Sequence, residues 1–482
     1  MKVLLVFTNI RTLIPAVYSF ATGYLSAVLK KHNHQVRVFC ANNIKEIPGI
    51  SRVLKEYDPD IVGLTGIGSQ FFYLMQIARL VKKWKNVPII CGGPHATLYP
   101  ESFLESGYVD GALVGEGEES IVEYMDALES GSDYTGIKNF WFKKDGQIIK
   151  NEYREFIQDL DSLPYVDREI YDHQKLINID NYTVYMLAGR GCPYNCTFCS
   201  VPYLRQKGKG EFSRLRSVDN VLGEIKLLSE RYKFKHIYFR DDTFTWNKEW
   251  ALEFFKKYPQ NFDYPFDMLT RADCVDKEIV ESLKHSKCDC VWMGIDSGNE
   301  YIRNTVLKKD ISNESILKAC RDLQAAGIKT LMTNMVGLPY ETPERFQETI
   351  DLNKKIHSSR GVVSLASGSG PKIFAFNTFP GTVLYELAQK EGWLKPMKYG
   401  FHVYKESIID MPDFPRKKVY RLRKKFRYLV YKDTQPFKAW FFRIYDSSLG
   451  QRLVKLIPMP LFGVITGIIS KIVSSREWRV KK

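Results

Sequence analysis

Residues 189–200 read Gly-Arg-Gly-Cys-Pro-Tyr-Asn-Cys-Thr-Phe-Cys-Ser and place three cysteines, Cys192, Cys196 and Cys199, in one short loop. Thiolates bind soft metal centres such as iron-sulfur clusters or zinc, and a structural zinc ion requires four protein ligands in a closed site. Three ligands from one loop would instead leave one iron of a 4Fe-4S cluster open. The spacing therefore indicates a reactive metal centre. The alternatives are three reduced, buried thiols or a zinc site completed from elsewhere in the chain.

The apolar run Tyr182 to Leu187 directly precedes this loop and starts a series of six predicted strands separated by helical segments. The helix expected over Val218 to Tyr232 repeats apolar residues on one side and has Ser217 at its N-cap position. Six βα units are fewer than the eight of a closed barrel, so residues 181–390 are expected to form a partial (β/α)6 TIM-like barrel that is open on one side. The other five strands are His236 to Phe239, Phe266 to Leu269, Val291 to Ile295, Thr330 to Val336 and Lys372 to Phe376.

Residues 1–135 also alternate short apolar runs with helix-period segments. Their strands are continuously apolar, which favours a parallel sheet covered on both faces, and therefore a doubly wound, Rossmann-like α/β domain. Ligands of such domains bind beyond the carboxyl ends of the strands, where glycines allow close approach of the backbone. Residues 136–180 are expected to form a connector with a hairpin around Asp145-Gly146. The candidate ligand-binding residues at these strand ends are Gly66, Ser69, Gly92, Gly93, Gly115 and Glu116.

Polar residues also follow the predicted barrel strands. Carboxylates suit an ammonium group or ribose hydroxyls, and an arginine suits a carboxylate. An amino acid joined to a nucleoside would need this set of groups. The adjacent Asp241 and Asp242 could instead bind Mg²⁺ or cap the next helix. The candidate cofactor-binding residues at these ends are Asp241, Asp242, Arg271, Asp296, Ser297 and Gly337, whereas no catalytic side chain is identified.

The positive charge of the chain is concentrated near its C-terminus. Residues 401–482 contain 19 Lys and Arg and 6 Asp and Glu, so 13 of the net 15 positive charges lie there. We expect residues 391–482 to be a basic, aromatic, mainly helical region. It could bind an anionic membrane surface, or it could be a solvated helix on the barrel edge. The apolar run Leu456 to Ile469 is too short and too interrupted to span a bilayer, and without an RNA-binding module nucleic acid is an unlikely partner.

Six cysteines lie outside the loop, in apolar runs, and are expected to be free buried thiols; Cys288 and Cys290 could alternatively form a second metal site. The chain starts directly with a strand-like run and shows no signal peptide, which suits a reducing compartment. We therefore expect a cytoplasmic protein, with association at the inner face of the membrane as an option. The other four cysteines are Cys40, Cys91, Cys274 and Cys320.

These motifs carry a family resemblance. The cysteine loop with Phe198, the run Phe239 to Phe244, the turn Gly294 to Gly298 and the turn Gly337-Leu338-Pro339 resemble the radical S-adenosylmethionine superfamily. Residues 1–135 resemble the cobalamin-binding domain that precedes the barrel in its largest class. Together the likeness covers about residues 1–390.

The resemblance implies a 4Fe-4S cluster on the three cysteines, with S-adenosylmethionine chelating the open iron and being split to a 5'-deoxyadenosyl radical. It also implies that Phe198 lies near the adenine, Asp241 or Asp242 near the methionyl ammonium, and the Gly337 turn beside the adenine. The protein's share of such chemistry is positioning and exclusion of water.

The expected function is cobalamin-dependent methylation of an unactivated carbon of a hydrophobic or lipid-like substrate, with an electron donor such as flavodoxin or ferredoxin. A radical cyclase or carbon-coupling enzyme of the same class is the alternative. A non-catalytic cluster or cobalamin sensor is an alternative of another kind. Methylthiolation of tRNA fits poorly, because the N-terminal domain contains only Cys40 and Cys91 and no second cysteine triplet.

One departure concerns cobalamin. Domains of the methionine-synthase kind carry Asp-x-His-x-x-Gly after the first strand, and this histidine is the lower cobalt ligand. Here that place reads Thr-Asn-Ile-Arg-Thr-Leu-Ile, residues 8–14, without a histidine. Cobalamin would therefore bind without a protein imidazole, or the domain has lost the cofactor.

Overall fold

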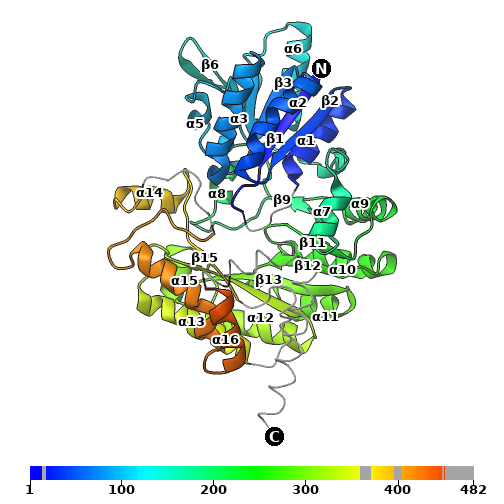
Figure 1. Ribbon diagram of the computed structural model, residues 1–482. Coiled ribbons are helices and arrows are strands. Elements are labelled where there is room, and N and C mark those ends of the chain that lie inside the picture. Colours follow the sequence, from blue (N-terminus) through cyan, green and yellow to red (C-terminus); the bar gives the residue numbers. More distant parts are fainter. Residues whose placement is uncertain (13–17, 359–370, 396–403, 448–449, 451–482) are drawn as a thin grey trace.

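The computed structural model describes residues 1–12, 18–358, 371–395, 404–447 and 450. Its strands form a seven-stranded sheet, a six-stranded sheet and a two-stranded ribbon. The N-terminal sheet with its helices lies above the second sheet in Figure 1, and the ribbon strand β9 (Gly189–Arg190) and helix α8 (Val201–Arg205) lie between the two.

The N-terminal sheet has the order β2-β1-β3-β4-β5-β6-β7, and its first five strands are parallel. Buried side chains alternate between the two faces: Leu4 and Val6 join one apolar cluster, while Val3 and Leu5 join another on the opposite face. The doubly wound prediction is therefore confirmed. These strands are β1 (Lys2–Thr8), β2 (Gln35–Ala41), β3 (Ile61–Thr65), β4 (Ile89–Gly92) and β5 (Gly111–Leu113). The helices are α1 (Phe20–Lys31), α2 (Ile50–Tyr57), α3 (Phe71–Trp84), α4 (Pro94–Leu98), α5 (Glu101–Leu104) and α6 (Glu118–Ser130).

The expected hairpin forms, but it is part of this sheet. Strands β6 (Phe140–Lys144) and β7 (Gln147–Lys150) pair antiparallel around Asp145-Gly146, and β6 also pairs antiparallel with β5. The hairpin adds two strands to the edge because Phe140 and Phe142 are buried against the domain core. Its place is thus in the first sheet and not in a separate connector.

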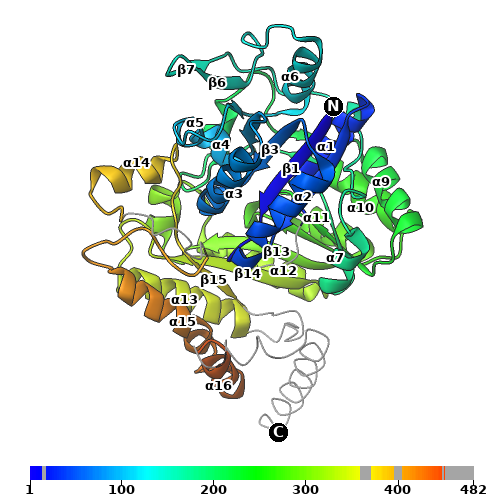
Figure 2. The ribbon, with the colours of Figure 1, turned by 45° about the horizontal axis from the view of Figure 1, so that its top comes forward.

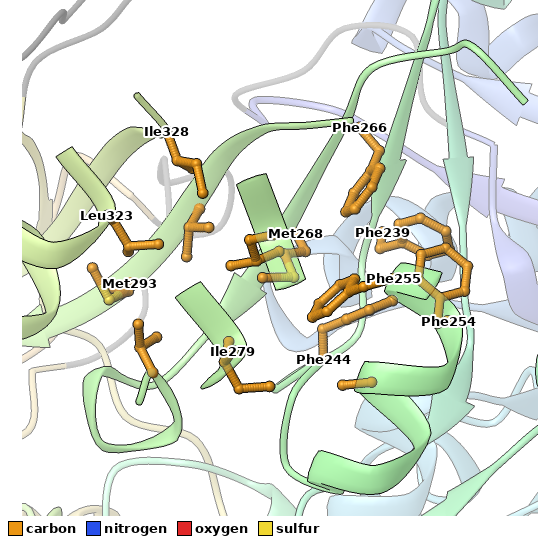
Figure 3. Packing of buried hydrophobic residues seen from close by; sticks show 14 of the residues in the cluster. Phe239, Phe244, Phe254, Phe255, Phe266, Met268, Ile279, Met293, Leu323 and Ile328 are labelled. Atoms are coloured by element: carbon orange, nitrogen blue, oxygen red, sulfur yellow. The ribbon is translucent and has the colours of Figure 1, made fainter. Parts of the chain in front are cut away.

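The second sheet is fully parallel, in the order β15-β14-β13-β12-β11-β8, and helices cover its outer face (Figure 2). Six strands without closure confirm the partial barrel. Figure 3 shows the core between strands and helices, where Phe239, Phe254 and Phe266 pack edge to face. The strands are β8 (Thr183–Met186), β11 (His236–Phe239), β12 (Phe266–Thr270), β13 (Cys288–Asp296), β14 (Lys329–Val336) and β15 (Lys372–Ala375). The covering helices are α9 (Val218–Arg231), α10 (Lys248–Asn261), α11 (Lys277–His285), α12 (Asn313–Ala325) and α13 (Pro343–Ser358).

The basic C-terminal region begins with helices that pack on the barrel. After α14 (Val383–Lys390), helix α15 (Arg416–Tyr431) lies beside α13, and α16 (Pro436–Tyr445) packs on α15 (Figure 2). Val419, Phe426 and Val430 are buried in one cluster with Phe346 of α13, while Arg421 and Lys425 are exposed. This is the arrangement of a solvated basic helix on the barrel edge. No helix among the described residues is long and apolar enough to cross a membrane, and Leu456 to Ile469 lies outside the described residues.

Candidate functional site

The cysteine loop lies at the carboxyl end of β8, between that strand and α8. Cys192, Cys196 and Cys199 are free thiols, and Cys196 is the most buried of the three. Among the described residues, the group of His, Cys, Asp and Glu side chains whose ligand atoms all lie within 4.8 Å is His236, Asp267 and Asp289. The three sulfurs are therefore not gathered tightly enough to share one ion. A cluster, whose metal atoms each take one thiolate, fits this donor set.

Hydrogen bonds to the backbone fix the loop. The Arg205 guanidinium of α8 donates to the carbonyl oxygens of Cys192 at 2.7 Å and Tyr194 at 3.2 Å. Thr197 is buried, and its Oγ1 donates to the Val306 carbonyl oxygen at 2.7 Å. These bonds fix the loop through its backbone and do not involve the thiols.

Two buried cations flank the central thiol. Arg271 Nη1 lies 3.7 Å from Cys196 Sγ, and the guanidinium also stacks on the Tyr194 ring and pairs with Asp273 at 2.8 Å. Lys309 bonds the Gly294 carbonyl oxygen at 2.6 Å and pairs with Asp296. Burial raises the pKa of the Cys196 thiol, whereas Lys309 and Arg271 favour its thiolate. The sequence motifs did not predict Lys309 as a site residue, because a lysine outside a motif gives no sign in the sequence that it will be buried.

Arg271 and Asp296 thus have protein partners. Arg271, expected to bind a ligand carboxylate, forms a salt bridge with Asp273 and lies against the cysteine loop. Asp296, expected to bind the cofactor, is buried in an ion pair with Lys309. Ser297 is fully buried, and its Oγ accepts from the Asn299 backbone N–H at 3.2 Å. Their positions are explained without a ligand, so their cofactor contacts stay predictions.

The two adjacent carboxylates after β11 have different surroundings. Asp241 is buried, and its carboxylate accepts from the backbone N–H groups of Ala188, at 3.0 and 3.1 Å, and Gly189, at 2.7 Å. Burial raises the pKa of Asp241 to about 7. The Asp242 side chain is exposed at the surface. Partial desolvation by the surrounding protein nevertheless raises the pKa of its carboxyl group. Asp241 therefore anchors the start of the metal loop, and Asp242 is the carboxylate free to meet a ligand ammonium.

The turn after β14 is fixed by a buried glutamate. Gly337 has φ +85°, which favours glycine, and its N–H donates to Glu341 Oε2 at 2.7 Å. Burial raises the pKa of Glu341 to about 8. Phe198 of the cysteine loop is half-buried and packs against the cluster that contains Leu338 of this turn. Phe198 and Leu338 of the Gly337 turn thus belong to one apolar cluster, and their place beside the adenine stays a prediction.

Glu116 joins the N-terminal domain to the two-stranded ribbon that contains β9. Its carboxylate accepts from Arg214 Nη2 at 2.7 Å and Arg190 Nη1 at 3.0 Å, and Glu118 accepts from Arg190 Nη2 at 2.6 Å. Burial opposes ionisation of Glu116, but the two guanidinium groups prevail and lower its pKa. The structure places Glu116 in an inter-domain ion pair, and its expected cofactor contact stays a prediction.

The glycines at the N-terminal strand ends occur for different structural reasons. A Cβ on Gly66 would lie 2.8 Å from Leu74 Cδ1, and a Cβ on Gly93, where φ is +85°, would lie 2.5 Å from Thr65 Oγ1. Internal packing therefore requires both. A Cβ on Gly115 would lie 3.3 Å from the Lys207 carbonyl oxygen of the barrel domain, whereas the nearest atom to one on Gly92 is 3.9 Å away. Gly92 is the glycine whose absent side chain leaves room beside a strand end.

The segment after the first strand, which lacks the histidine, is bonded to a glutamine from the neighbouring strand end. Gln70 is buried and accepts from Thr8 Oγ1 at 2.8 Å, and its amide donates to the Ile10 carbonyl oxygen at 2.9 Å and to Ser69 Oγ at 3.3 Å. His95 is buried among aromatic rings, and burial lowers its pKa to about 4. The strand ends can therefore accommodate cobalamin only without the usual histidine after the first strand.

Comparison with protein families gives two matches. Residues 186–352 match the radical SAM superfamily, and residues 13–125 match the B12 binding domain. The first range contains the cysteine loop and four of the six barrel strands, and the second contains most of the parallel N-terminal strands.

Similar proteins span nearly the whole chain. An uncharacterised methyltransferase of Pyrococcus horikoshii is 28% identical over 88% of this chain and 91% of its own length. The cytidylyl-2-hydroxyethylphosphonate methyltransferase of Streptomyces wedmorensis is 24% identical, over 82% of each chain. The solved structure of the radical S-adenosylmethionine methyltransferase TsrM of Kitasatospora setae superimposes with a TM-score of 0.66 at 16% identity, over 82% of this chain and 76% of that one.

The two family matches agree with the geometry of the cysteine loop and of the N-terminal sheet. The chain therefore belongs to the radical S-adenosylmethionine superfamily and carries a B12-binding domain, and the cofactors of this combination are a 4Fe-4S cluster, S-adenosylmethionine and cobalamin.

Proposed function

We propose that this protein methylates an unactivated carbon of a small molecule. One observation carries the proposal: the strand ends of the B12-binding domain face the cysteine loop. Helix α4, which follows Gly93, packs beside α8, which follows the loop. Gly115 approaches Lys207 closely, and Gly68 lies near Phe379 of the barrel. A corrin on the strand ends and a cluster on the loop would therefore share one space.

The chain's own residues would position the reactants. Cys192, Cys196 and Cys199 would hold the cluster, and Arg271 and Lys309 would offset its negative charge beside Cys196. Asp242 is placed to bind an ammonium group, and Phe198 and the Gly337 turn would border the adenine. When bound, the cluster, S-adenosylmethionine and cobalamin supply the radical and the methyl group, while the protein orients them and excludes water.

The names of relatives support methyl transfer but include another chemistry. Two relatives described above are named methyltransferases, and a hopanoid C-2 methylase of Rhodopseudomonas palustris is 21% identical over 70% of this chain. An anaerobic magnesium-protoporphyrin IX monomethyl ester cyclase of Rubrivivax gelatinosus is 23% identical over 70%. A radical cyclase is therefore the competing function.

Isotope transfer separates these functions. Anaerobically reconstituted, reduced protein would be incubated with S-adenosylmethionine whose methyl group is deuterated, together with candidate substrates. We expect 5'-deoxyadenosine and a product carrying the label. A product without label beside 5'-deoxyadenosine would contradict methylation and favour the cyclase, and absence of 5'-deoxyadenosine would favour the sensor.

Two further predictions concern the partners of this protein. An external one-electron donor such as flavodoxin or ferredoxin is needed for reduction. Association with anionic membranes would now depend on residues other than the apolar face of α15, because that face is packed on the barrel. Cosedimentation of the full chain with anionic liposomes tests it, and a protein that stays in the supernatant would contradict it.

A further inference from the structure

The inner face of the barrel sheet carries a continuous aromatic wall. Tyr185, Tyr238 and Trp292 come from β8, β11 and β13, and their rings follow one another at centroid distances of 5.8 and 5.2 Å. Tyr185 and Tyr238 are buried in one cluster with Tyr18 and Tyr24, whereas Trp292 is only half-buried. The wall therefore offers the Trp292 end to a ligand.

Two cations lie on this wall. The Lys372 ammonium is 3.9 Å from the centre of the Trp292 ring, and the Arg240 guanidinium is 5.1 Å from that of Tyr238. Lys372 is half-buried, and Arg240 is exposed. They reach the wall from opposite sides, because Lys372 belongs to β15 and Arg240 directly follows β11.

Unlike the neighbouring basic side chains, these two cations form no salt bridge among the described residues. Arg271 pairs with Asp273, Lys309 with Asp296, and Lys329 with Asp289. Over the described part of the chain, neither Lys372 nor Arg240 has an ion pair within 4.0 Å, and Asp267, the carboxylate that acts on Lys372, forms its salt bridge with His236. Keeping a half-buried ammonium without a counter-ion is costly, since burial favours the neutral amine. A bound anion would remove that cost.

The position of the pair relates it to the reacting groups. Arg240 immediately precedes Asp241, which anchors the cysteine loop, and Asp242. On the inner face, Trp292 lies two residues before Gly294, whose carbonyl oxygen bonds Lys309 beside Cys196. A molecule held at Lys372 and Arg240 would therefore lie below the cluster loop on the same side of the sheet.

From this arrangement we infer that the substrate carries a phosphate, phosphonate or carboxylate group attached to a planar or apolar part. Lys372 and Arg240 bind the anion, and the exposed end of the Trp292–Tyr238 wall binds the apolar part. This inference rests on the proposed function, which it deepens by naming a substrate class. It replaces a purely hydrophobic or lipid-like substrate with an anionic one.

Binding of simple probes tests the inference. Phenyl phosphate, benzoate and phenol share the ring and differ in charge, and calorimetry on the anaerobically reconstituted protein compares their affinities. We expect phenyl phosphate or benzoate to bind at least about tenfold more tightly than phenol, because a hydrogen bond to a charged group contributes about that factor. The tighter of the two tells which anion is preferred. Equal affinities for all three probes would overturn the inference.

Variants locate the effect. Lys372→Met and Arg240→Gln should each lose most of the preference for the anion, while Lys372→Arg keeps it. Lys233→Met, at an exposed lysine between α9 and β11, is the matched control and should change nothing. A preference that survives both charge removals would contradict the assignment, and the wild-type comparison decides even if a variant fails to fold.

The same preparations separate this inference from the proposed function. Release of 5'-deoxyadenosine from S-adenosylmethionine without substrate depends on the cluster and the S-adenosylmethionine site and needs no bound substrate. If that release occurs and the anion preference is absent, only the substrate class is wrong. If the release is absent, the proposed function fails whatever the probes do.

Discussion

Arg190, two residues before the first cysteine of the metal loop, joins this loop to the N-terminal domain. Its Nη1 lies 3.0 Å from Glu116 Oε1. Glu118 binds the other end of the same guanidinium at 2.6 Å. The Arg190 guanidinium also stacks on the Tyr24 ring of α1 at 4.9 Å. The orientation of the two cofactor-binding faces thus depends on residues that carry no cofactor chemistry themselves.

Removing the Glu116 charge should loosen this junction. Glu116→Gln leaves Arg190 and Arg214 with fewer partners in a mostly buried place, so we expect unfolding free energy to fall by roughly 1–3 kcal/mol. Urea unfolding followed by circular dichroism measures it. Glu278→Gln, which breaks an exposed pair with Lys248, is the control and should leave the midpoint unchanged. Equal midpoints for both variants would contradict the inter-domain role of Glu116.

Asp241 should act on the loop rather than on a ligand. In Asp241→Ala the N–H groups of Ala188 and Gly189 lose their buried acceptor, which costs roughly 2–4 kcal/mol. We expect lower stability and lower iron content after reconstitution. Asp242→Ala should keep the wild-type iron content and instead weaken binding of S-adenosylmethionine. The reverse pattern, with iron lost only in Asp242→Ala, would show that the two aspartates have been assigned the wrong way round.

Charges beside Cys196 should set the cluster's reduction potential. A nearby cation stabilises the more negative reduced form, so Arg271→Gln should lower the potential and Asp273→Asn should raise it, each by roughly 30–60 mV. Potentiometric titration followed by electron paramagnetic resonance measures both. Shifts of the same sign in the two variants would point to a structural disturbance and contradict the electrostatic account.

Lys372 should make stability and anion binding depend on pH. Burial is the main cause that lowers its pKa to about 8; Arg427 and Arg240 lower it further, and Cys290 and Asp267 oppose them. Because the unfolded chain keeps the ordinary higher pKa, the folded protein is penalised below about pH 8, and the penalty disappears as pH rises through about 10.4.

Lys372→Met should therefore be more stable than wild type at pH 7, by roughly 1–3 kcal/mol, and equal to it near pH 10. Urea midpoints at the two pH values check this, with Lys233→Met as the control. Phenyl phosphate should also bind wild type more weakly above pH 8, as the ammonium loses its proton. A stability gap that does not change with pH would contradict a titrating Lys372.

The sequence predicted the elements well where periodicity was strong. All six barrel strands and the helix after Ser217 are confirmed, and Ser217 Oγ accepts from the Asn220 N–H at 3.1 Å as an N-cap. Parallel strands that are buried on both faces give continuous apolar runs, which are easily read. The Asp145-Gly146 hairpin was predicted too, but its pairing with β5 was not, because antiparallel pairing at a sheet edge has no signal in the hairpin itself.

The site was predicted less completely. The cysteine loop was recognisable because metal ligands have fixed spacing, whereas the partners of Glu116, Asp241 and Arg271 depend on contacts between segments far apart in the chain. A carboxylate at a strand end has the same sequence signal whether it binds a ligand, a backbone N–H or the side chain of a distant arginine. Lys309 and Lys372 were not predicted as site residues for the same reason, because their burial is determined only by the folded sheet.

The proposed chemistry depends on one inference: three cysteines leave one iron of the cluster open for S-adenosylmethionine. Its most direct test is the release of 5'-deoxyadenosine by reduced, anaerobically reconstituted protein, with iron content measured on the same sample. We predict release by the wild type and by Cys40→Ser, and none by Cys192→Ala, Cys196→Ala or Cys199→Ala. Wild-type protein that binds iron yet leaves S-adenosylmethionine intact under strong reductant would contradict the account.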